Sequence, residues 1–248
     1  MTSKFPVDRS DCLKYLNEES ADEDYMRLCE TSSAISTGDQ KALKKTTSLW
    51  YQMDDPLTFY SNDKLTDIEL LQIQLKMLNT HCRLSAEKGH LVKQSNYLIS
   101  SKYDLLIECG QSTNFLTKYV FHKIFDEYCS AVMKLSTRDL SPIMLDIITY
   151  INDNLTGDFS LQLLADKFDI HPVHLARKFK QETGMTFVEY INRQRVDLAK
   201  FLFYLDQFSL NEIAYLSGFN SHSYFTKVFK KITGKKPSQF KRKVKLVY

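Results

Sequence analysis

Basic side chains gather toward the C-terminal end of this 248-residue chain. Between residues 213 and 248 there is no acidic side chain, whereas nine lysines and arginines lie from Lys227 to Lys245. Residues 1–140 carry 17 basic and 20 acidic side chains, a net charge of −3, and residues 141–248 carry 16 and 10, a net charge of +6. Ammonium and guanidinium groups at this density bind polyanions, because they donate hydrogen bonds to phosphate oxygens. The alternative is a merely solvated surface.

The basic run coincides with the second copy of a sequence pattern that occurs twice. Leu164 and Ala165 align with Ile213 and Ala214 at an offset of 49 residues. At an offset of 50, Leu175 aligns with Phe225, Phe179 with Phe229, Gly184 with Gly234, and Tyr190 with Phe240. Two copies of one small unit at a fixed spacing predict two docking elements for a periodic partner. Double-stranded DNA is the obvious candidate.

Each copy predicts a short helix, a tight turn and a second helix, which is the helix-turn-helix arrangement. In the first copy a helix over 161–168 follows Ser160, and Pro172 opens a helix that continues to Glu182. In the second copy Ser209 and Glu212 form a capping box that begins a helix over 210–217. Gly218 suits the turn, and Asn220 is expected to cap a helix that ends at Ile232.

A longer helix is predicted between the two copies, over residues 188–206. About 19 residues at 1.5 Å each span roughly 28 Å. Neighbouring major-groove faces on one side of DNA lie about 34 Å apart. One rigid helix can therefore set both units on the same face of a duplex.

The C-terminal residues resemble the DNA-binding domain of the AraC/XylS family of bacterial transcription regulators, over about residues 143–243. The matching elements are Ser160-Leu161, Leu164-Ala165, Leu175 to Lys180, Gly184 to Ile191, Arg195 to Ala199, Ser209 to Ala214 and Gly218 to Ser238. The resemblance implies a sequence-specific DNA-binding transcription regulator of a bipartite promoter site, with activation favoured over repression. Promoter DNA and RNA polymerase are the implied partners.

The resemblance also assigns individual side chains to the DNA. Base-contacting positions are Val173, Ala176 and Arg177 in the first recognition helix and His222, Ser223, Tyr224 and Lys227 in the second. Phosphate-contacting positions are Lys178, Lys180, Lys230 and Lys231. Arg177 and Lys227 are equivalent under the fifty-residue offset, and either can donate to guanine or to a phosphate. Val173 and Ala176 can only contact thymine methyl groups, and an aromatic side chain at Tyr224 could pack instead.

The N-terminal half is also predicted to be helical, which makes the fold class all-α. Residues 1–140 contain three glycines and two prolines, too few for the turns of a β-sandwich or barrel. Helical patterns cover 67–85, 91–109 and 114–135, the last capped by Asn114, and a further one over 143–154 follows in the C-terminal part. The first sixty residues predict shorter helices with breaks at 36–39 and 54–56. Residues 136–142 are the best linker. We therefore expect two domains, 1–138 and 139–248.

The role of the N-terminal domain is less constrained by sequence. Its helical pattern departs from the cupin-like barrel of many family members, so a sugar-type ligand cannot be inferred. Five aromatic residues cluster within 115–128, where a core is favoured over a ligand pocket. The hypothesis is a sensory or dimerising domain, with a homodimer and an unidentified small-molecule or peptide effector as its partners.

Several other classes of protein are disfavoured by sequence. No catalytic motif such as HExxH, GxSxG or a Walker A loop occurs, which predicts that the chain is not an enzyme and has no cofactor. Five cysteines without a CxxC pair predict neither a disulfide framework nor a metal site. No signal peptide or membrane-length apolar run occurs, so a cytoplasmic protein without membrane contact is expected. A module that binds an acidic protein or RNA is disfavoured by the repeated helix-turn-helix pattern.

Overall fold

The computed structural model describes residues 18–50 and 66–245. Within these residues the regular structure is helical, and the only strand-like pairing is an isolated bridge between Leu91 and Ser136. The all-α fold class predicted from the sequence is therefore confirmed. In the same part of the chain, no helix combines the length and the apolar character needed to cross a membrane.

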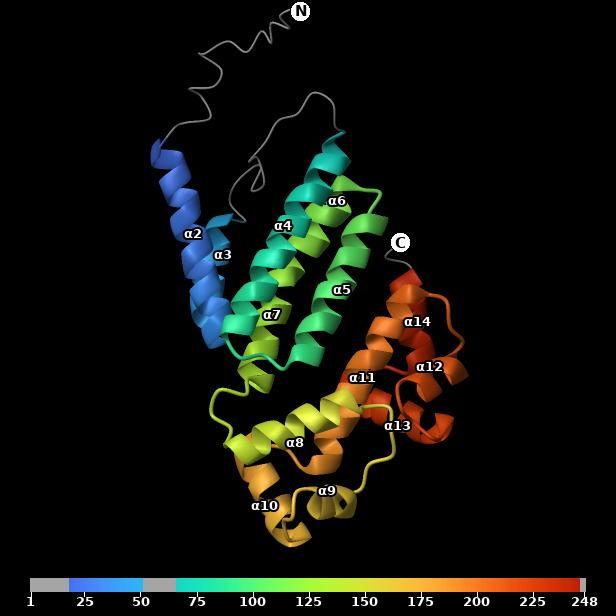
Figure 1. Cartoon of the computed structure of the whole chain (residues 1–248). Helices are drawn as coiled ribbons and strands as arrows, with labels where there is room; N and C mark the ends of the chain where they lie inside the picture. Colours follow the sequence, from blue (N-terminus) through green and yellow to red (C-terminus); the bar gives the residue numbers. More distant parts are fainter. Residues whose placement is uncertain (1–17, 51–65, 246–248) are drawn as a thin grey trace, which may run out of the picture.

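The N-terminal helices pack side by side as a bundle in the upper part of Figure 1. They are α2 (Glu18–Thr37), α3 (Gln40–Trp50), α4 (Asp67–Lys88), α5 (Lys93–Cys109), α6 (Thr113–Phe115), the π-helical turn η1 (Leu116–Phe121) and α7 (His122–Leu135). The three long helices predicted from periodicity are confirmed as α4, α5 and the run from α6 to α7. The first predicted break is confirmed at Gly38, whose φ is +68°, and the second, at 54–56, lies outside the described residues.

The predicted cap of the third long helix was wrong. Ser112, rather than Asn114, accepts the hydrogen bond from a backbone N–H of the first turn, that of Phe115, at 3.4 Å. The helix therefore begins at Thr113, and Asn114 lies inside its first turn. The pattern of apolar residues fixed the buried face of this helix but not its first residue, because both polar side chains suit a cap.

The bundle has a continuous apolar core. The aromatic cluster lies mainly inside it, since Phe121, Phe125 and Tyr128 are fully buried, and Phe115 and Tyr119 pack against them. The Tyr128 hydroxyl donates to the side-chain oxygen of Asn79 at 2.8 Å, which satisfies its buried polar group. Three of the five residues therefore belong to the core and the other two cover it, as the sequence favoured.

Two of the five cysteines are buried in this core. Burial raises the pKa of the Cys129 thiol to about 12 and raises that of Cys82 further above its usual range. Neither thiol is therefore suited to reaction as a thiolate. Cys12 lies outside the described residues.

Between residues 142 and 245 the chain forms seven helices, α8 (Pro142–Asp153), α9 (Leu161–Lys167), α10 (Pro172–Thr183), α11 (Phe187–Leu205), α12 (Leu210–Leu216), α13 (His222–Thr233) and α14 (Pro237–Lys245). All but α14 were predicted, with ends that agree to within two residues. Helix α14 was missed because it is short and rich in basic residues, with apolar Phe240 and Val244 as the side chains that pack inward.

Helix α11 joins two separate apolar cores of the C-terminal part. Its first turns contribute Tyr190 and Ile191 to the core of α8, α9 and α10. Its later turns contribute Val196, Ala199 and Phe203 to the core of α12, α13 and α14. In Figure 1, α10 lies to the lower left of α11 and α13 to its right.

The N-terminal bundle contacts α11 directly. The Ser95 hydroxyl on α5 donates to the side-chain oxygen of Gln194 on α11 at 3.2 Å, and Gln194 is fully buried. Tyr204, also on α11, packs against both the bundle core and the core of α12 to α14. The predicted linker is fixed as well, because Arg138 donates from Nη2 to the Ser36 carbonyl at 3.2 Å.

Candidate nucleic-acid interface

The first helix-turn-helix unit is formed by α9 and α10. The Ser160 hydroxyl caps α9 by accepting from the Leu163 N–H at 3.0 Å. Between the helices Asp169 adopts a left-handed conformation with φ +51°, and the Ile170 N–H donates to the Ala165 carbonyl at 3.0 Å. The turn is thus closed by one backbone hydrogen bond that follows a left-handed residue.

The second unit, of α12 and α13, repeats this turn at the same positions. At the offset of 49 residues Gly218 is the equivalent of Asp169, and its φ is +86°. The Phe219 N–H donates to the Ala214 carbonyl at 2.9 Å, as the Ile170 N–H does to Ala165 in the first unit. The capping box predicted at Ser209 and Glu212 is present. The repeat seen in the sequence therefore corresponds to one repeated backbone hydrogen bond.

The two recognition helices begin differently. Ser221, rather than the predicted Asn220, caps α13 by accepting from the Tyr224 N–H at 3.4 Å. Asn220 instead donates from Nδ2 to Asp158 at 2.9 Å. At the equivalent position before α10, His171 makes no side-chain capping bond. The start of α10 consequently depends more on Pro172, whose fixed φ suits a first helical residue.

Each recognition helix has one buried and one exposed face. Leu175 and Phe179 anchor α10, and Phe225 and Phe229 occupy the same positions in α13, with Val228 beside them. Of the eleven side chains predicted to contact DNA, nine are exposed: Val173, Arg177, Lys180, His222, Ser223, Tyr224, Lys227, Lys230 and Lys231. Val173 is 71% exposed although it is apolar, so the packing of α10 does not account for it.

Ala176 and Lys178 are only partly exposed, on the flanks of α10. The Lys178 ammonium lies 2.7 Å from a carboxylate oxygen of Glu182. Glu182 also accepts from the N–H and the hydroxyl of Ser141, at 2.8 and 2.9 Å, so it fastens α10 to the start of α8. Although partial burial opposes it, Lys178 and Ser141 hold the pKa of Glu182 below its usual range.

Tyr224 lies on the exposed face of α13 and is also tied to α11. Its ring is 45% exposed and lies near Phe219, with 6.1 Å between ring centroids. Its hydroxyl accepts from Nδ2 of Asn192 at 3.0 Å. The ring is thus partly packed, and contact of Tyr224 with DNA bases stays a prediction.

Sequence reasoning missed two exposed side chains of α10. His174 and Gln181 lie on the same open face as Arg177. The fifty-residue offset contained the signal, because it aligns His174 with Tyr224 and Gln181 with Lys231. Applying the repeat to every position of the second recognition helix would have found both.

Arg195 was also missed as a structural residue; it links the two units from the middle of α11. Its Nε donates to the Leu155 carbonyl at 3.0 Å and its Nη2 to the Gly157 carbonyl at 2.6 Å, both in the loop before α9. Its guanidinium carbon lies 5.9 Å from the ring centroid of Phe219, in the turn of the second unit. Burial lowers the pKa of Arg195, an effect opposed by Asp158.

The close approach of these groups requires glycine in the second turn. A Cβ on Gly218 would lie 2.9 Å from Arg195 Nε and 2.9 Å from the Thr156 Cα. Together with the Asn220–Asp158 bond, Arg195 and Gly218 form a clamp between the loop 155–158 and the turn 218–220. We call these contacts the inter-unit clamp. It supplements α11 in fixing the orientation of α10 relative to α13.

The comparisons with known proteins agree with this geometry. A family model described as a helix-turn-helix domain matches residues 164–243. A bifunctional transcriptional activator and DNA repair enzyme, AdaA of Bacillus subtilis, is 38% identical over 103 residues, which cover 41% of this chain and 49% of that protein. The arabinose operon regulatory protein of Salmonella typhimurium is 26% identical over 147 residues, 57% of this chain and 52% of that protein.

The C-terminal region belongs to the AraC/XylS family. Among solved structures, the AraC/XylS-type region is similar to the C-terminal domain of AraT, a response regulator from Geobacillus stearothermophilus. The identity is 32%, the match covers 42% of this chain and 87% of that one, and the TM-score is 0.41. The chain spans about half the length of the two curated relatives named above, so each match concerns a part of these proteins rather than the whole.

Proposed function

We propose that this protein is a sequence-specific DNA-binding transcription regulator that binds a bipartite promoter site. The observation that carries the proposal is the mounting of α10 and α13, both with open polar faces, on the single helix α11. At 1.5 Å per residue its 19 residues span about 28 Å. This length suits insertion of the two recognition helices into successive major grooves, about 34 Å apart. Activation is favoured because the names of several relatives include an activator.

Base contacts are assigned to the exposed faces of both helices. Arg177 and Lys227 are the principal hydrogen-bond donors to guanine, and His222, Ser223 and Tyr224 contribute in the second groove. Contact with thymine methyl groups is assigned to Val173 and Ala176. We add His174 and Gln181, which share the open face of α10.

Phosphate contacts are assigned to lysines near the ends of both recognition helices. Lys180, Lys230 and Lys231 are exposed and stand on the later turns, where they position the helix without specifying the sequence. Lys178 has its charge largely neutralised by Glu182 at 2.7 Å. We therefore expect Lys178 to contribute less to phosphate binding than the other three.

The division into a domain of residues 1–138 and a DNA-binding domain of 139–248 is also part of the proposal. It is supported by the separation of the bundle core from the two cores of the C-terminal helices. The N-terminal bundle is proposed to sense an effector or to mediate a homodimer. RNA polymerase is the expected partner at the promoter, and the protein would act in the cytoplasm, where the promoter lies.

We propose no catalytic activity. The AdaA relative is also named as a DNA repair enzyme, but the match covers only half of that protein. Of the cysteines in the described residues, Cys82 and Cys129 are buried and have raised thiol pKa values. Such thiols are poor nucleophiles.

The first test is DNA binding as a function of salt. The full-length protein is titrated with the DNA upstream of its own gene and with random duplex of equal length, and the bound segment is mapped by footprinting. We expect two protected segments about one helical turn apart, and an affinity that falls as salt rises because counterions are released. Equal affinity for both DNAs, without a footprint, would reject the proposal.

The second test separates base contacts from phosphate contacts. Arg177→Ala should lose about 1–3 kcal/mol on the mapped site and relax discrimination at one base pair. Lys230→Ala is the matched control on an equivalent exposed face and should weaken all sequences to a similar degree. If Arg177→Ala weakens specific and random DNA equally, Arg177 is a phosphate contact instead.

A further inference from the structure

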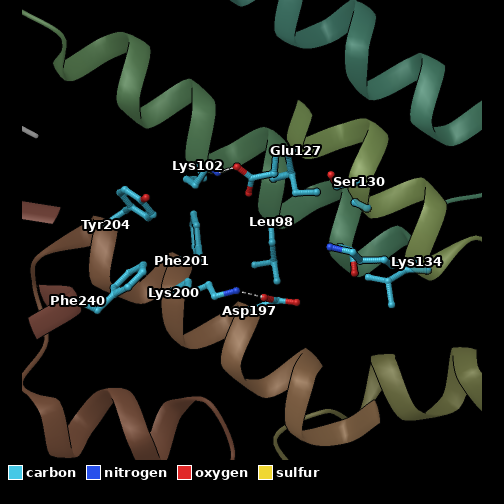
Figure 2. Close-up of a pocket in the computed structure, with 14 residues that line it drawn as sticks. Leu98, Lys102, Glu127, Ser130, Lys134, Asp197, Lys200, Phe201, Tyr204 and Phe240 are labelled. Atoms are coloured by element: carbon cyan, nitrogen blue, oxygen red, sulfur yellow. Dashed lines mark hydrogen bonds and ion pairs between the residues drawn. The ribbon is translucent and has the colours of Figure 1, made fainter. Parts of the chain in front are cut away.

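A cavity of about 360 Å³ lies where the N-terminal bundle meets the DNA-binding domain. Figure 2 shows its walls, which come from α5 and α7 on one side and from α11 and α14 on the other. Small-molecule sites in proteins are commonly a few hundred Å³ in volume and often lie between domains. The size and position of this cavity therefore suit a small ligand that touches both parts of the protein.

The ionisable side chains of the cavity are not balanced in charge. Lys102 pairs with Glu127, and Lys200 pairs with Asp197 at 2.7 Å. The fifth charged residue, Lys134 on α7, has no carboxylate partner within 4.0 Å among the described residues. One positive charge is thus left over, and a group with a single negative charge would neutralise it.

The Lys102–Glu127 pair is held in place and Lys200 is paired with Asp197, so Lys134 is the cation available to a ligand. Besides Lys102, Glu127 also accepts from the Tyr103 hydroxyl at 3.0 Å. Although burial opposes it, Lys102 and this hydrogen bond hold the pKa of Glu127 below its usual range. The Lys102 ammonium lies 4.2 Å from the ring centroid of Tyr103, which restrains it further.

The rest of the wall is mainly apolar. Leu98 and Ile99 of α5, Leu135 at the end of α7, Phe201 of α11 and Phe240 of α14 line the cavity. These side chains would cover the body of an apolar ligand, whereas Lys134 stands exposed beside them. An occupant with a hydrocarbon or aromatic body and one acidic group matches both features.

One wall of the cavity also touches the second recognition helix unit. Phe240 packs against Phe203 of α11 and against Phe229 of α13, with ring centroids 5.5 and 5.4 Å apart. Phe229 is one of the anchors of α13. A ligand that displaces or braces Phe240 therefore acts on the packing of α13 through a single aromatic contact.

We propose that this cavity is an effector site for a small organic monoanion with an apolar body, such as an arylalkanoate. The Lys134 ammonium binds the carboxylate, and the apolar side chains of both domains enclose the remainder. Binding changes the affinity for DNA because the ligand contacts α11 and Phe240 as well as the bundle. The regulatory half of this inference rests on the proposed function, whereas the binding half does not.

The binding half is tested without DNA, by calorimetry on the full-length protein. The probes are phenylbutyrate, phenylbutanol and phenylbutylamine, which share one apolar body and differ in charge. We expect one molecule of phenylbutyrate to bind and to bind more tightly than the alcohol or the amine. Lys134→Gln should weaken phenylbutyrate about fivefold, the effect of a partly exposed ion pair, and leave phenylbutanol unchanged.

Two further variants locate the site. Lys123→Gln removes another exposed lysine of α7 that does not line the cavity, and it should bind phenylbutyrate as the wild-type protein does. Ala131→Phe places a ring into the cavity and should abolish binding, with circular dichroism to check that the variant folds. If it does not fold, Lys134→Gln against Lys123→Gln decides. No binding by phenylbutyrate, equal binding by all three probes, or an unchanged Lys134→Gln overturns the site.

The regulatory half is tested on the upstream DNA. Phenylbutyrate should change the affinity of the wild-type protein for that DNA by at least about threefold, within reach of typical allosteric coupling. In Lys134→Gln the same change should need about fivefold more phenylbutyrate, because the variant binds the probe about fivefold more weakly. If phenylbutyrate binds but the affinity for DNA does not change, the regulatory role is rejected and the binding site stands. If the protein binds no DNA under any condition, the proposed function fails independently of the cavity.

Discussion

Replacement of Arg195 by methionine tests whether the inter-unit clamp fixes the spacing of the two recognition helices. Methionine keeps an unbranched apolar stem that can still lie against Phe219, but it cannot donate to the Leu155 and Gly157 carbonyls. The change removes two hydrogen bonds from the inter-unit clamp and leaves the helical pattern of α11 intact. The orientation of the first unit relative to the second then depends on α11 and on the remaining Asn220–Asp158 hydrogen bond.

The size of the effect follows from these two hydrogen bonds. A hydrogen bond to a charged group contributes about 1.5–3 kcal/mol when it is desolvated. Arg195 is only partly buried and Gly157 is exposed, so a smaller total, about 2 kcal/mol, applies to the pair. This energy is the most that the two Arg195 hydrogen bonds can add to the cost of misaligning the two units. It corresponds to about thirtyfold in an equilibrium constant.

The assay compares two versions of the mapped DNA site by fluorescence anisotropy. One version is native, and the other carries about five extra base pairs between the half-sites, which rotates one half-site to the opposite face of the duplex. The wild-type protein should bind the native version much more tightly. In Arg195→Met the ratio of the two affinities should fall by up to about thirtyfold, mainly through weaker binding of the native site.

Arg193→Met is the control, because Arg193 is an exposed arginine on the same helix. Loss of a positive charge alone lowers the affinity for both versions alike and leaves their ratio unchanged. If Arg195→Met keeps the wild-type ratio while it remains folded, the two Arg195 hydrogen bonds do not help to set the spacing.

Two further predictions concern stability. Gly218→Ala should lower the free energy of unfolding by about 2–4 kcal/mol, because the left-handed backbone strains an alanine and its Cβ meets Arg195 and Thr156 at 2.9 Å. Gly234 is the control, because its φ of +74° is similar but nothing lies within 4 Å of an added Cβ. Gly234→Ala should therefore lower the free energy of unfolding, measured with urea, by only about 1–2 kcal/mol. Equal losses of stability in the two variants would contradict the steric argument. Glu182 has a folded-state pKa below its ordinary value of 4.5, so its stabilisation is present above that value and is lost as pH falls through the folded pKa. Glu182→Gln should therefore lower the free energy of unfolding by about 1–2 kcal/mol near neutral pH. The difference from the wild-type protein should vanish in acid, where Glu182 is protonated. A difference that is constant with pH would exclude ionised Glu182 as its source.

Much of the architecture could be predicted because it depends on local patterns. The helices α4, α5 and α7 follow from apolar residues repeated at helical spacing, and the aromatic residues of α7 fall on the face that is buried. Caps were less predictable. Ser112 and Asn114, like Ser221 and Asn220, are neighbouring residues that can both accept from a helix N-terminus, and only the backbone conformation selects one.

The exposed faces of the recognition helices were also largely predictable. Because Leu175 and Phe179 must be buried, helical geometry places Arg177 on the opposite side, and the same holds for Lys227 in the second copy. Lys178 could not be placed in this way. Its ion pair depends on Glu182 and on the start of α8, which reaches α10 only after the chain has folded.

Two helix-turn-helix units, a long helix between them and a helical N-terminal half follow from local sequence patterns, because periodicity, capping residues and the repeat offset are properties of neighbouring residues. The contacts between these parts, in contrast, depend on how the chain folds in three dimensions. Arg195 donates to the backbone carbonyls of Leu155 and Gly157, and a backbone acceptor cannot be recognised from the identity of its side chain. Likewise Lys102, Lys134 and Lys200 meet around one cavity only because α11 docks against the bundle, a contact between residues about a hundred positions apart.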